Sequence, residues 1–183
     1  MQWDICCKRM KVRANRSMKA LLGADAEFPE RVSVPCPSAL LAELEDGFKE
    51  LDGCVVPKRF ENGPIWSAGR VRADNQDDET GLECTVSKIH IEDFVRNDLP
   101  LADITRHGIA YALRLREALT RSVPAGVFRI IVDVQLPDAD LDLGGIYTIR
   151  FHKVRVGQVW LDDDLEHYRQ NAVLAMEFAA TEP

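Results

Sequence analysis

Two strand-like segments near the C-terminal end of the chain, at residues 127–136 and 146–156, constrain the fold more than any other feature. From Phe128 to Leu136, apolar residues occupy every second position, and most of the residues between them are polar. This alternation is typical of a strand with one buried face. Because the connection between the segments is short and contains Gly144 and Gly145, we expect them to pair as antiparallel neighbours.

A long helix is predicted over residues 101–121, because Ile104, Tyr111 and Leu115 recur at helical spacing. We expect this helix to pack on the apolar face of the strand pair. Residues 173–178 are apolar on both faces, which indicates an interior strand. Together these elements predict an α+β protein, with a mainly antiparallel sheet and one or two helices packed on one face.

The remaining elements follow from weaker patterns. A helix is expected over residues 39–51, with Ser38 as its N-cap and Gly53 after its end. Residues 82–94 are expected to form a strand with a bend near 87–88. The shorter expected elements are a strand around Trp3, Ile5 and Cys7, a strand at 65–71, and a helix capped by Asp162 or Asp163 that runs to Tyr168.

Length and cysteine content indicate a single-domain cytoplasmic protein. We expect residues 1–183 to form one domain, with 73–81 as the place where a subdivision would fall. No apolar run approaches the roughly 20 residues of a membrane span, so no membrane partner is expected. The chain holds five cysteines and no CxxC pair, which is typical of reduced, mostly buried thiols.

The charge of the chain is unevenly distributed. Residues 1–22 hold six basic residues and one acidic residue, a net charge of +5, so the rest carries −12 of the total of −7. An acidic body repels nucleic acid and favours basic partners. The basic start lacks the apolar run of a secretory signal. Such a run is more often the solvated face of a strand or helix than a patch for nucleic acid or a membrane.

The sequence contains no motif of known catalytic chemistry. It has no GxSxG or SxxK nucleophile motif, no HExxH zinc motif and no glycine-rich phosphate loop. Asp138, Asp140 and Asp142 resemble the start of a calcium loop, but Leu143 and Ile149 stand where an EF-hand needs Gly and Glu. We therefore predict no catalytic residue, no metal and no cofactor.

A few side chains could form a site only on folding. His90 and Glu92 are predicted to share one face of a strand, and His152 lies on another strand. An enzyme or a small-ligand protein built from these residues or from a cysteine is the main alternative to a binding function. A subunit that forms a homodimer through an apolar sheet face is a third.

Segment 160–168 combines a tryptophan, three aspartates, a glutamate and a tyrosine. A helix cap accounts for one or two of the aspartates. Carboxylates beside aromatic groups are also common where a protein plugs a basic site. We therefore predict a surface for a basic protein partner, with Trp160 as its support. The predicted contacts are Asp162, Asp163, Asp164, Glu166, Tyr168, Asp138, Asp140 and Asp142.

The run GQVWLDDDLEHY at residues 157–168, together with the acidic body, resembles bacterial immunity proteins of toxin–immunity systems, including those paired with contact-dependent inhibition toxins. The resemblance implies a small intracellular α+β protein without catalytic residues. It also implies that the chain binds a cognate toxin, such as a nuclease domain, and holds it inactive. Clustered carboxylates would then imitate the phosphates that a nuclease binds, and would speed the encounter.

Overall fold

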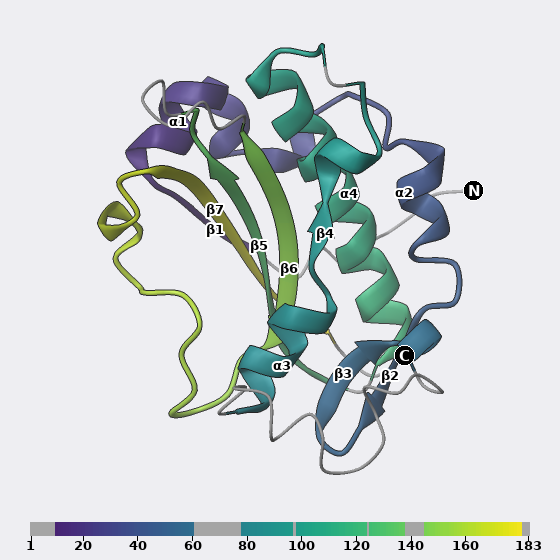
Figure 1. The fold of residues 1–183 in the computed structure, drawn as a ribbon. Helices are drawn as coiled ribbons and strands as arrows, with labels where there is room; N and C mark the ends of the chain where they lie inside the picture. Colours follow the sequence, from purple (N-terminus) through teal and green to yellow (C-terminus); the bar gives the residue numbers. More distant parts are fainter. Residues whose placement is uncertain (1–9, 61–77, 97, 124, 138–144, 181–183) are drawn as a thin grey trace, which may run out of the picture.

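The computed structural model describes residues 10–60, 78–96, 98–123, 125–137 and 145–180 (Figure 1). Its strands form a five-stranded antiparallel sheet in the order β1-β7-β5-β6-β4 and a two-stranded sheet of β2 and β3. The strands are β1 (Lys11–Ala14), β2 (Phe48–Leu51), β3 (Cys54–Pro57), β4 (Ile89–His90), β5 (Gly126–Gln135), β6 (Ile146–Lys153) and β7 (Asn171–Ala180).

The α-helices are α1 (Arg16–Leu22), α2 (Ser38–Ala42), α3 (Glu79–Val86) and α4 (Leu101–Ser122). Short 3-10 helices are η1 (Gly23–Ala26), η2 (Pro29–Arg31), η3 (Lys58–Phe60), η5 (Ile91–Asp93) and η6 (Leu165–His167). The predicted α+β class is confirmed. No helix in the described ranges is long and apolar enough to cross a membrane.

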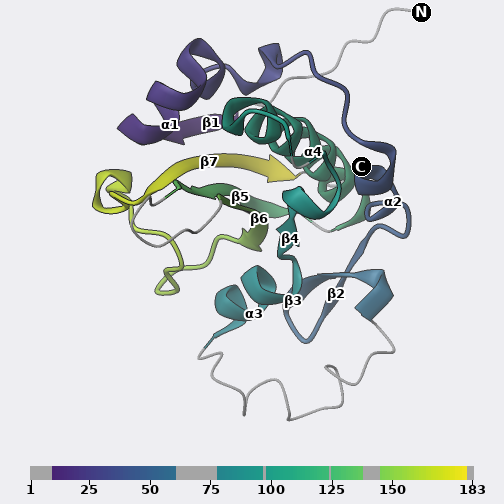
Figure 2. The same ribbon diagram turned by 45° about the horizontal axis from the view of Figure 1, so that its top comes forward.

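The predicted strand pair forms the centre of the large sheet. β5 and β6 are antiparallel neighbours, with Val132 opposite Ile149. β7 lies between β5 and β1, so its prediction as an interior strand is also confirmed. α4 packs on the apolar face of these strands, where Leu115 joins Ile130, Val132 and Ile149 in the main core (Figure 2).

The main core draws on the whole described chain. Ile130, Val132 and Ile149 are at most 2% exposed, as the alternating pattern requires. The core extends from Met18 to Ala180, so residues on both sides of 73–81, the place predicted for a subdivision, contribute to it. Because α4 covers this face of the sheet, a homodimer contact through it would require α4 to move.

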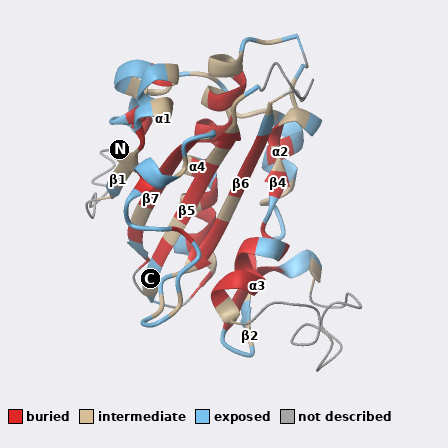
Figure 3. Ribbon diagram, turned by 60° about the vertical axis from the view of Figure 1, so that its left-hand side comes forward, coloured by how far each residue is buried: buried red, intermediate tan, exposed pale blue. Residues whose placement is uncertain are grey.

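The opposite face of the sheet is more polar. Arg129 and Asp133 of β5 lie on this face, with His152 of β6 opposite Arg129. α3 and the segment 154–170 lie on this side of the sheet (Figure 2). Figure 3 shows much of α3 and the central strands as buried, whereas the segment 154–170 is largely exposed or half-buried. This segment carries most of the acidic residues predicted to bind a partner.

The predicted helix over residues 39–51 is wrong. α2 ends at Ala42, and Phe48–Leu51 forms β2, which pairs with β3 through the turn Asp52-Gly53. Both turn residues have a positive φ, 49° and 83°, as a two-residue hairpin turn of type I′ requires. Gly53 therefore closes a hairpin rather than a helix, and Ser38 is the first residue of α2 rather than its cap.

The predicted strand over residues 82–94 is also wrong, because its first half is α3. Asp78 caps this helix, and its carboxylate accepts from the Gly81 N–H at 2.7 Å. Almost every residue of α3 is buried, so apolar residues at alternate positions do not distinguish a strand from a helix. The bend predicted near 87–88 marks the end of α3 and the start of β4.

Several predicted boundaries also change. β6 ends at Lys153, so the strand predicted over 146–156 is too long. The helix predicted to run to Tyr168 is the short 3-10 helix η6, which is capped by Asp164 rather than by Asp162 or Asp163. The strands predicted around residues 3–7 and at 65–71 lie outside the described residues.

Candidate interaction surface

The connection from β6 to β7 carries a group of exposed apolar side chains. Val156 is 104% exposed, Val159 77% and Trp160 38%. Val154 and Val127 are also exposed, and they are neighbours because the Val154 N–H donates to the Val127 carbonyl at 2.8 Å. These are five of the eight large apolar side chains that are exposed in the described part of the chain. Exposed apolar groups that gather in this way mark interaction sites more often than scattered ones do.

Arg155 anchors the first part of this connection in the protein interior. Its guanidinium donates to both oxygens of Glu83, at 2.7 and 2.8 Å, and to the Gly53 carbonyl at 2.7 Å. Glu83 is 0% exposed and also accepts from the backbone N–H groups of Val55 and Lys153 at 2.6 and 2.7 Å. The hydrogen bonds that Arg155 donates to the Glu83 carboxylate raise the pKa of Arg155. The buried carboxylate thus joins β3, β6 and the connection.

A second anchor follows three residues later. The side-chain oxygen of Gln158 accepts from the backbone N–H and hydroxyl of Thr80, at 3.2 and 2.8 Å, and its amide donates to Glu79. Between the anchors, Gly157 has φ +81°, a conformation that suits glycine. The polar anchors face α3, and Val156 and Val159 are left in solvent. The connection is therefore fixed to α3 at two points on either side of Val156.

Trp160 lies where the apolar and acidic parts of the connection meet. The Arg150 guanidinium lies 5.7 Å from its ring centroid, a cation–π contact that orients the indole. The prediction assigned the supporting role to Trp160, but two leucines that follow it are the buried residues. Leu161 and Leu165 pack with Ile131, Val173 and Ala175 on the polar side of the sheet.

Two of the predicted acidic contacts bond to the N-terminal part of the fold. Arg13 of β1 donates to the Asp163 carboxylate at 3.1 Å and to its carbonyl at 2.8 Å. The Arg16 N–H, at the start of α1, donates to Glu166 at 3.1 Å. The Asp163 side chain nevertheless remains 89% exposed. Asp163 is therefore accessible to a partner, whereas Glu166 also helps to position α1.

The predicted contacts Asp162, Asp164 and Tyr168 belong to one hydrogen-bonded group. Asp162 accepts from the Asp164 N–H and from His167, both at 2.9 Å, and the Asp162 N–H donates to the Tyr168 hydroxyl at 3.0 Å. Asp164 in turn accepts from the Glu166 N–H at 3.1 Å. The hydrogen bonds from Asp164 and His167 lower the pKa of Asp162, and the same carboxylate raises the pKa of His167. These hydrogen bonds fix the side chains of this group relative to one another, and the carboxylates remain partly exposed to solvent.

The remaining predicted residues do not join this group. Asp138, Asp140 and Asp142 lie outside the described residues. His90 contacts Glu92 at 3.2 Å, but Glu92 lies in η5, so the prediction that both share one face of a strand is wrong. His152, however, lies four positions along β6 from the residue opposite His90, a separation of about 13 Å. No group of three or more potential metal ligands forms within the described ranges.

Burial shifts the pKa values of the three described thiols, of which Cys36 is half-buried, and of His152. Burial raises the pKa of Cys36 and of Cys54 to about 11, and it raises the pKa of Cys84 as well. His152 is 2% exposed, and its Nε2 has no hydrogen-bond partner. Burial lowers its pKa. Neutral thiols are poor nucleophiles, so these groups do not favour nucleophilic catalysis.

The sequence reasoning missed the apolar part of the surface and the buried ion pair that supports it. Val156 was assigned to the end of a strand, and Val159 lay in the run 157–168 but was not predicted as a contact. The signal was the run VRVGQV at residues 154–159, in which valines surround a glycine after a strand. Glu83 gave no such signal, because the sequence around a carboxylate in an expected strand does not indicate that Arg155, far along the chain, is its partner.

The described residues form an α+β protein whose connection from β6 to β7 exposes apolar side chains at 156–160 and acidic side chains at 162–166. The chain belongs to the Uncharacterized protein PM0498 family, whose model matches residues 13–182. No curated protein and no solved structure matches it. The matched span includes the whole surface, with both anchors and the ties to Arg13 and Arg16.

Proposed function

We propose that this protein binds a protein partner through the surface formed by residues 154–168, called the loop surface from here on. The observation that carries the proposal is the exposure of Val156, Val159 and Trp160 on a connection that is anchored at Arg155 and Gln158. A fixed surface loses little conformational entropy on binding, so more of its contact energy appears as affinity.

The chemistry of the loop surface indicates the chemistry of its partner. The apolar side chains require an apolar depression, and tryptophan is a frequent hot-spot residue in such contacts. Asp163, Asp164 and their neighbours require basic residues beside that depression. The side chains of Asp162 and Asp164 are 48% and 60% exposed. Exposed charges of this kind act mainly on the association rate.

Toxin immunity in the cytoplasm is the narrower form of this proposal. The acidic character of the chain, its described free cysteines and the acidic segment support it. In this form the partner is a toxin whose basic site is covered by the loop surface. Identification of the partner distinguishes toxin immunity from binding to another kind of protein.

The first test removes the apolar contacts without disturbing the fold. The double variant Val156→Ser/Val159→Ser should keep the wild-type unfolding midpoint, because both side chains are exposed. It should weaken the complex with a partner isolated on the wild-type protein by at least tenfold, measured by calorimetry. Leu41→Ser is the matched control, because Leu41 is exposed on α2, away from the loop surface, and should leave affinity unchanged.

The second test concerns the acidic part. Asp163→Ala should slow association with the same partner and reduce the dependence of the association rate on salt. Glu45→Ala, an exposed acidic change elsewhere, should have a much smaller effect. If the partner binds the valine double variant and Asp163→Ala as tightly and as fast as wild type, the loop surface is not its binding site.

A further inference from the structure

A second surface of opposite charge lies at the other edge of the sheet. β1 is the terminal strand of the order β1-β7-β5-β6-β4. It carries Lys11 and Arg13, and α1 follows it with Arg16 and Lys19. This is the described part of the basic N-terminal stretch. Its charge is opposite to that of the remaining chain, so it requires a separate explanation.

The unpaired side of β1 is defined by its hydrogen bonds to β7. The Asn15 N–H, directly after the strand, donates to the Val173 carbonyl at 3.1 Å. In an antiparallel pair the bonding direction alternates from residue to residue, so Lys11 and Arg13 also point their main-chain groups toward β7. The main-chain groups of Val12 and Ala14 therefore point to the edge of β1 with which no described strand pairs. An exposed edge of this kind can pair with another extended chain.

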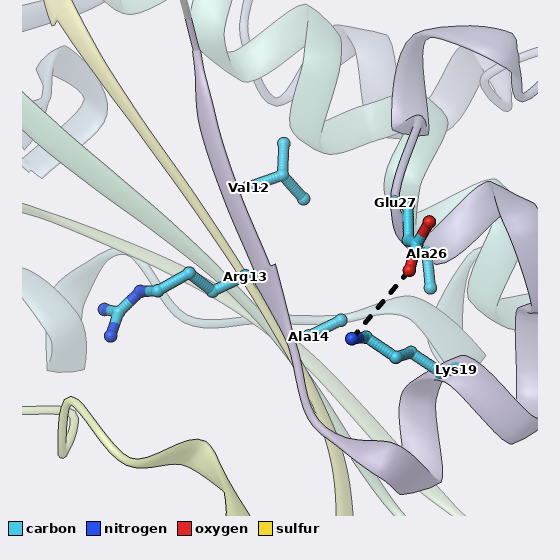
Figure 4. Close-up of a pocket in the computed structure, with 6 residues that line it drawn as sticks. All are labelled: Val12, Arg13, Ala14, Lys19, Ala26 and Glu27. Atoms are coloured by element: carbon cyan, nitrogen blue, oxygen red, sulfur yellow. Dashed lines mark ion pairs between the residues drawn. The ribbon is translucent and has the colours of Figure 1, made fainter.

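A hollow of about 410 Å³ lies along this edge (Figure 4). It is lined by Val12, Arg13, Ala14, Lys19, Ala26 and Glu27. Figure 4 shows the Val12 and Ala14 side chains on the side of α1 and η1, whereas the Arg13 side chain points to the opposite side. Lys19 and Glu27 form a loose ion pair at 3.9 Å across the hollow, and each is about half exposed. The hollow thus gives space beside three consecutive residues of an edge strand.

We propose that this edge binds an extended acidic segment of another protein, which adds to the sheet as a sixth strand beside β1. Val12 and Ala14 would supply main-chain hydrogen bonds, the usual source of affinity in strand addition. Because successive side chains of a strand point to opposite faces, every second residue of the segment would lie beside Lys11 and Arg13. Acidic residues fit those positions. The residues between them would enter the hollow, next to the Lys19–Glu27 pair.

The basic charges of β1 also argue against a second copy of this chain as the strand that pairs with this edge. Two β1 strands paired about a two-fold axis would place Lys11 and Arg13 of one copy beside those of the other. Like charges across a strand pair are destabilising, and short edges that carry lysine are typical of strands protected from self-pairing. Asp163 offsets part of the charge of Arg13, whereas Lys11 is exposed and lies opposite Glu177, which is bonded to Arg129.

The test uses a capped seven-residue peptide of alternating Glu and Thr as the probe. Exchange of the Val12 and Ala14 amides, followed by NMR, should slow on addition of the peptide, because both would become hydrogen-bonded. Peptide affinity, measured by fluorescence anisotropy, should fall about fivefold in Lys11→Glu. Lys88→Glu, an exposed lysine far along the chain, is the matched control and should bind as wild type does.

Three results would overturn the proposal. An alternating Lys and Thr peptide could bind equally well, or the acidic peptide could bind without protecting Val12 and Ala14. The β1 amides could also become protected in free protein as its concentration rises, in which case a second copy occupies the edge. Val156→Ser/Val159→Ser should leave peptide binding unchanged, so this proposal and the function of the loop surface fail separately.

Discussion

Replacing Glu83 should be the most destabilising single change to the support of the loop surface. The side chain is 0% exposed, and its two oxygens accept four hydrogen bonds of 2.6–2.8 Å. Glu83→Ala leaves the Arg155 guanidinium and two backbone N–H groups without their acceptor. Removing one partner of a buried ion pair costs about 3–5 kcal/mol, and a buried unsatisfied N–H costs about 1–3 kcal/mol. Because Arg155 is 16% exposed and can regain some water, its own cost falls well below the figure for a fully buried pair, and we expect about 3–5 kcal/mol in total.

Urea unfolding followed by circular dichroism measures this loss. With a slope of roughly 2 kcal/mol per molar urea for a protein of this size, the midpoint should fall by about 2 M. Glu83→Gln keeps the volume of the side chain but places an amide NH₂ where an acceptor is needed, so it should lie between wild type and Glu83→Ala. Glu45→Ala is the exposed control and should stay within about 0.5 kcal/mol of wild type.

The result that would refute this reasoning is equally specific. If Glu83→Ala loses less than about 1 kcal/mol, the range of an exposed pair, then the four hydrogen bonds do not stabilise the fold as described. A double-mutant cycle with Arg155→Ala separates the ion pair from the backbone contacts, because only the latter remain once Arg155 is removed.

Three further changes test the core, a buried histidine and a cap. Ile130→Ala, at a residue 0% exposed, should cost about 2–5 kcal/mol in urea unfolding, whereas Val127→Ala at an exposed position of the same strand should cost less than about 0.5 kcal/mol. Because burial lowers the pKa of His152, the unfolded chain takes up a proton below about pH 6.5 that the native protein does not. Stability should therefore fall on acidification through that range, and His152→Asn should reduce the slope. Asp164→Ala removes the cap of η6 and should cost about 0.5–2 kcal/mol.

The sequence predicted the elements whose periodicity is strong. The alternation from Phe128 to Leu136 and the helical spacing from Ile104 to Leu115 identified the centre of the sheet and its covering helix, because one face of each is buried and the other is not. The same reasoning failed for α3, since nearly all of its residues are buried and no polar face remains to reveal the period. It failed at the β2–β3 hairpin because Asp52-Gly53, a strong hairpin signal, was assigned to a helix end.

The acidic segment was found from sequence, but its internal bonding was not. Three consecutive aspartates are visible as composition, whereas the role of each depends on distant groups. Asp163 is bonded by Arg13, 150 positions away along the chain, and no local pattern indicates such a partner. The apolar residues at 156 and 159 were missed because the exposure of a side chain depends on whether the rest of the fold covers it, and the local sequence does not show this.

The ion pair between Arg13 and Asp163 joins the two proposed surfaces and gives them opposite responses to one substitution. Asp163 is part of the acidic loop surface, and Arg13 is part of the basic edge. Asp163→Ala removes a negative charge from the first and frees a positive charge at the second. Binding of a basic partner to the loop surface should weaken, and binding of the acidic peptide at β1 should strengthen by about twofold to fivefold, as expected for one exposed ion pair.

Both effects should shrink in high salt, because the charges concerned are exposed and are screened. Asp163→Asn, which keeps the size of the side chain, should reproduce both changes if charge is their cause. Anisotropy of the labelled peptide and calorimetry with the basic partner measure the two affinities on the same protein. If both affinities move in the same direction, the substitution acts through the fold rather than through charge, and the electrostatic account of the two surfaces is wrong.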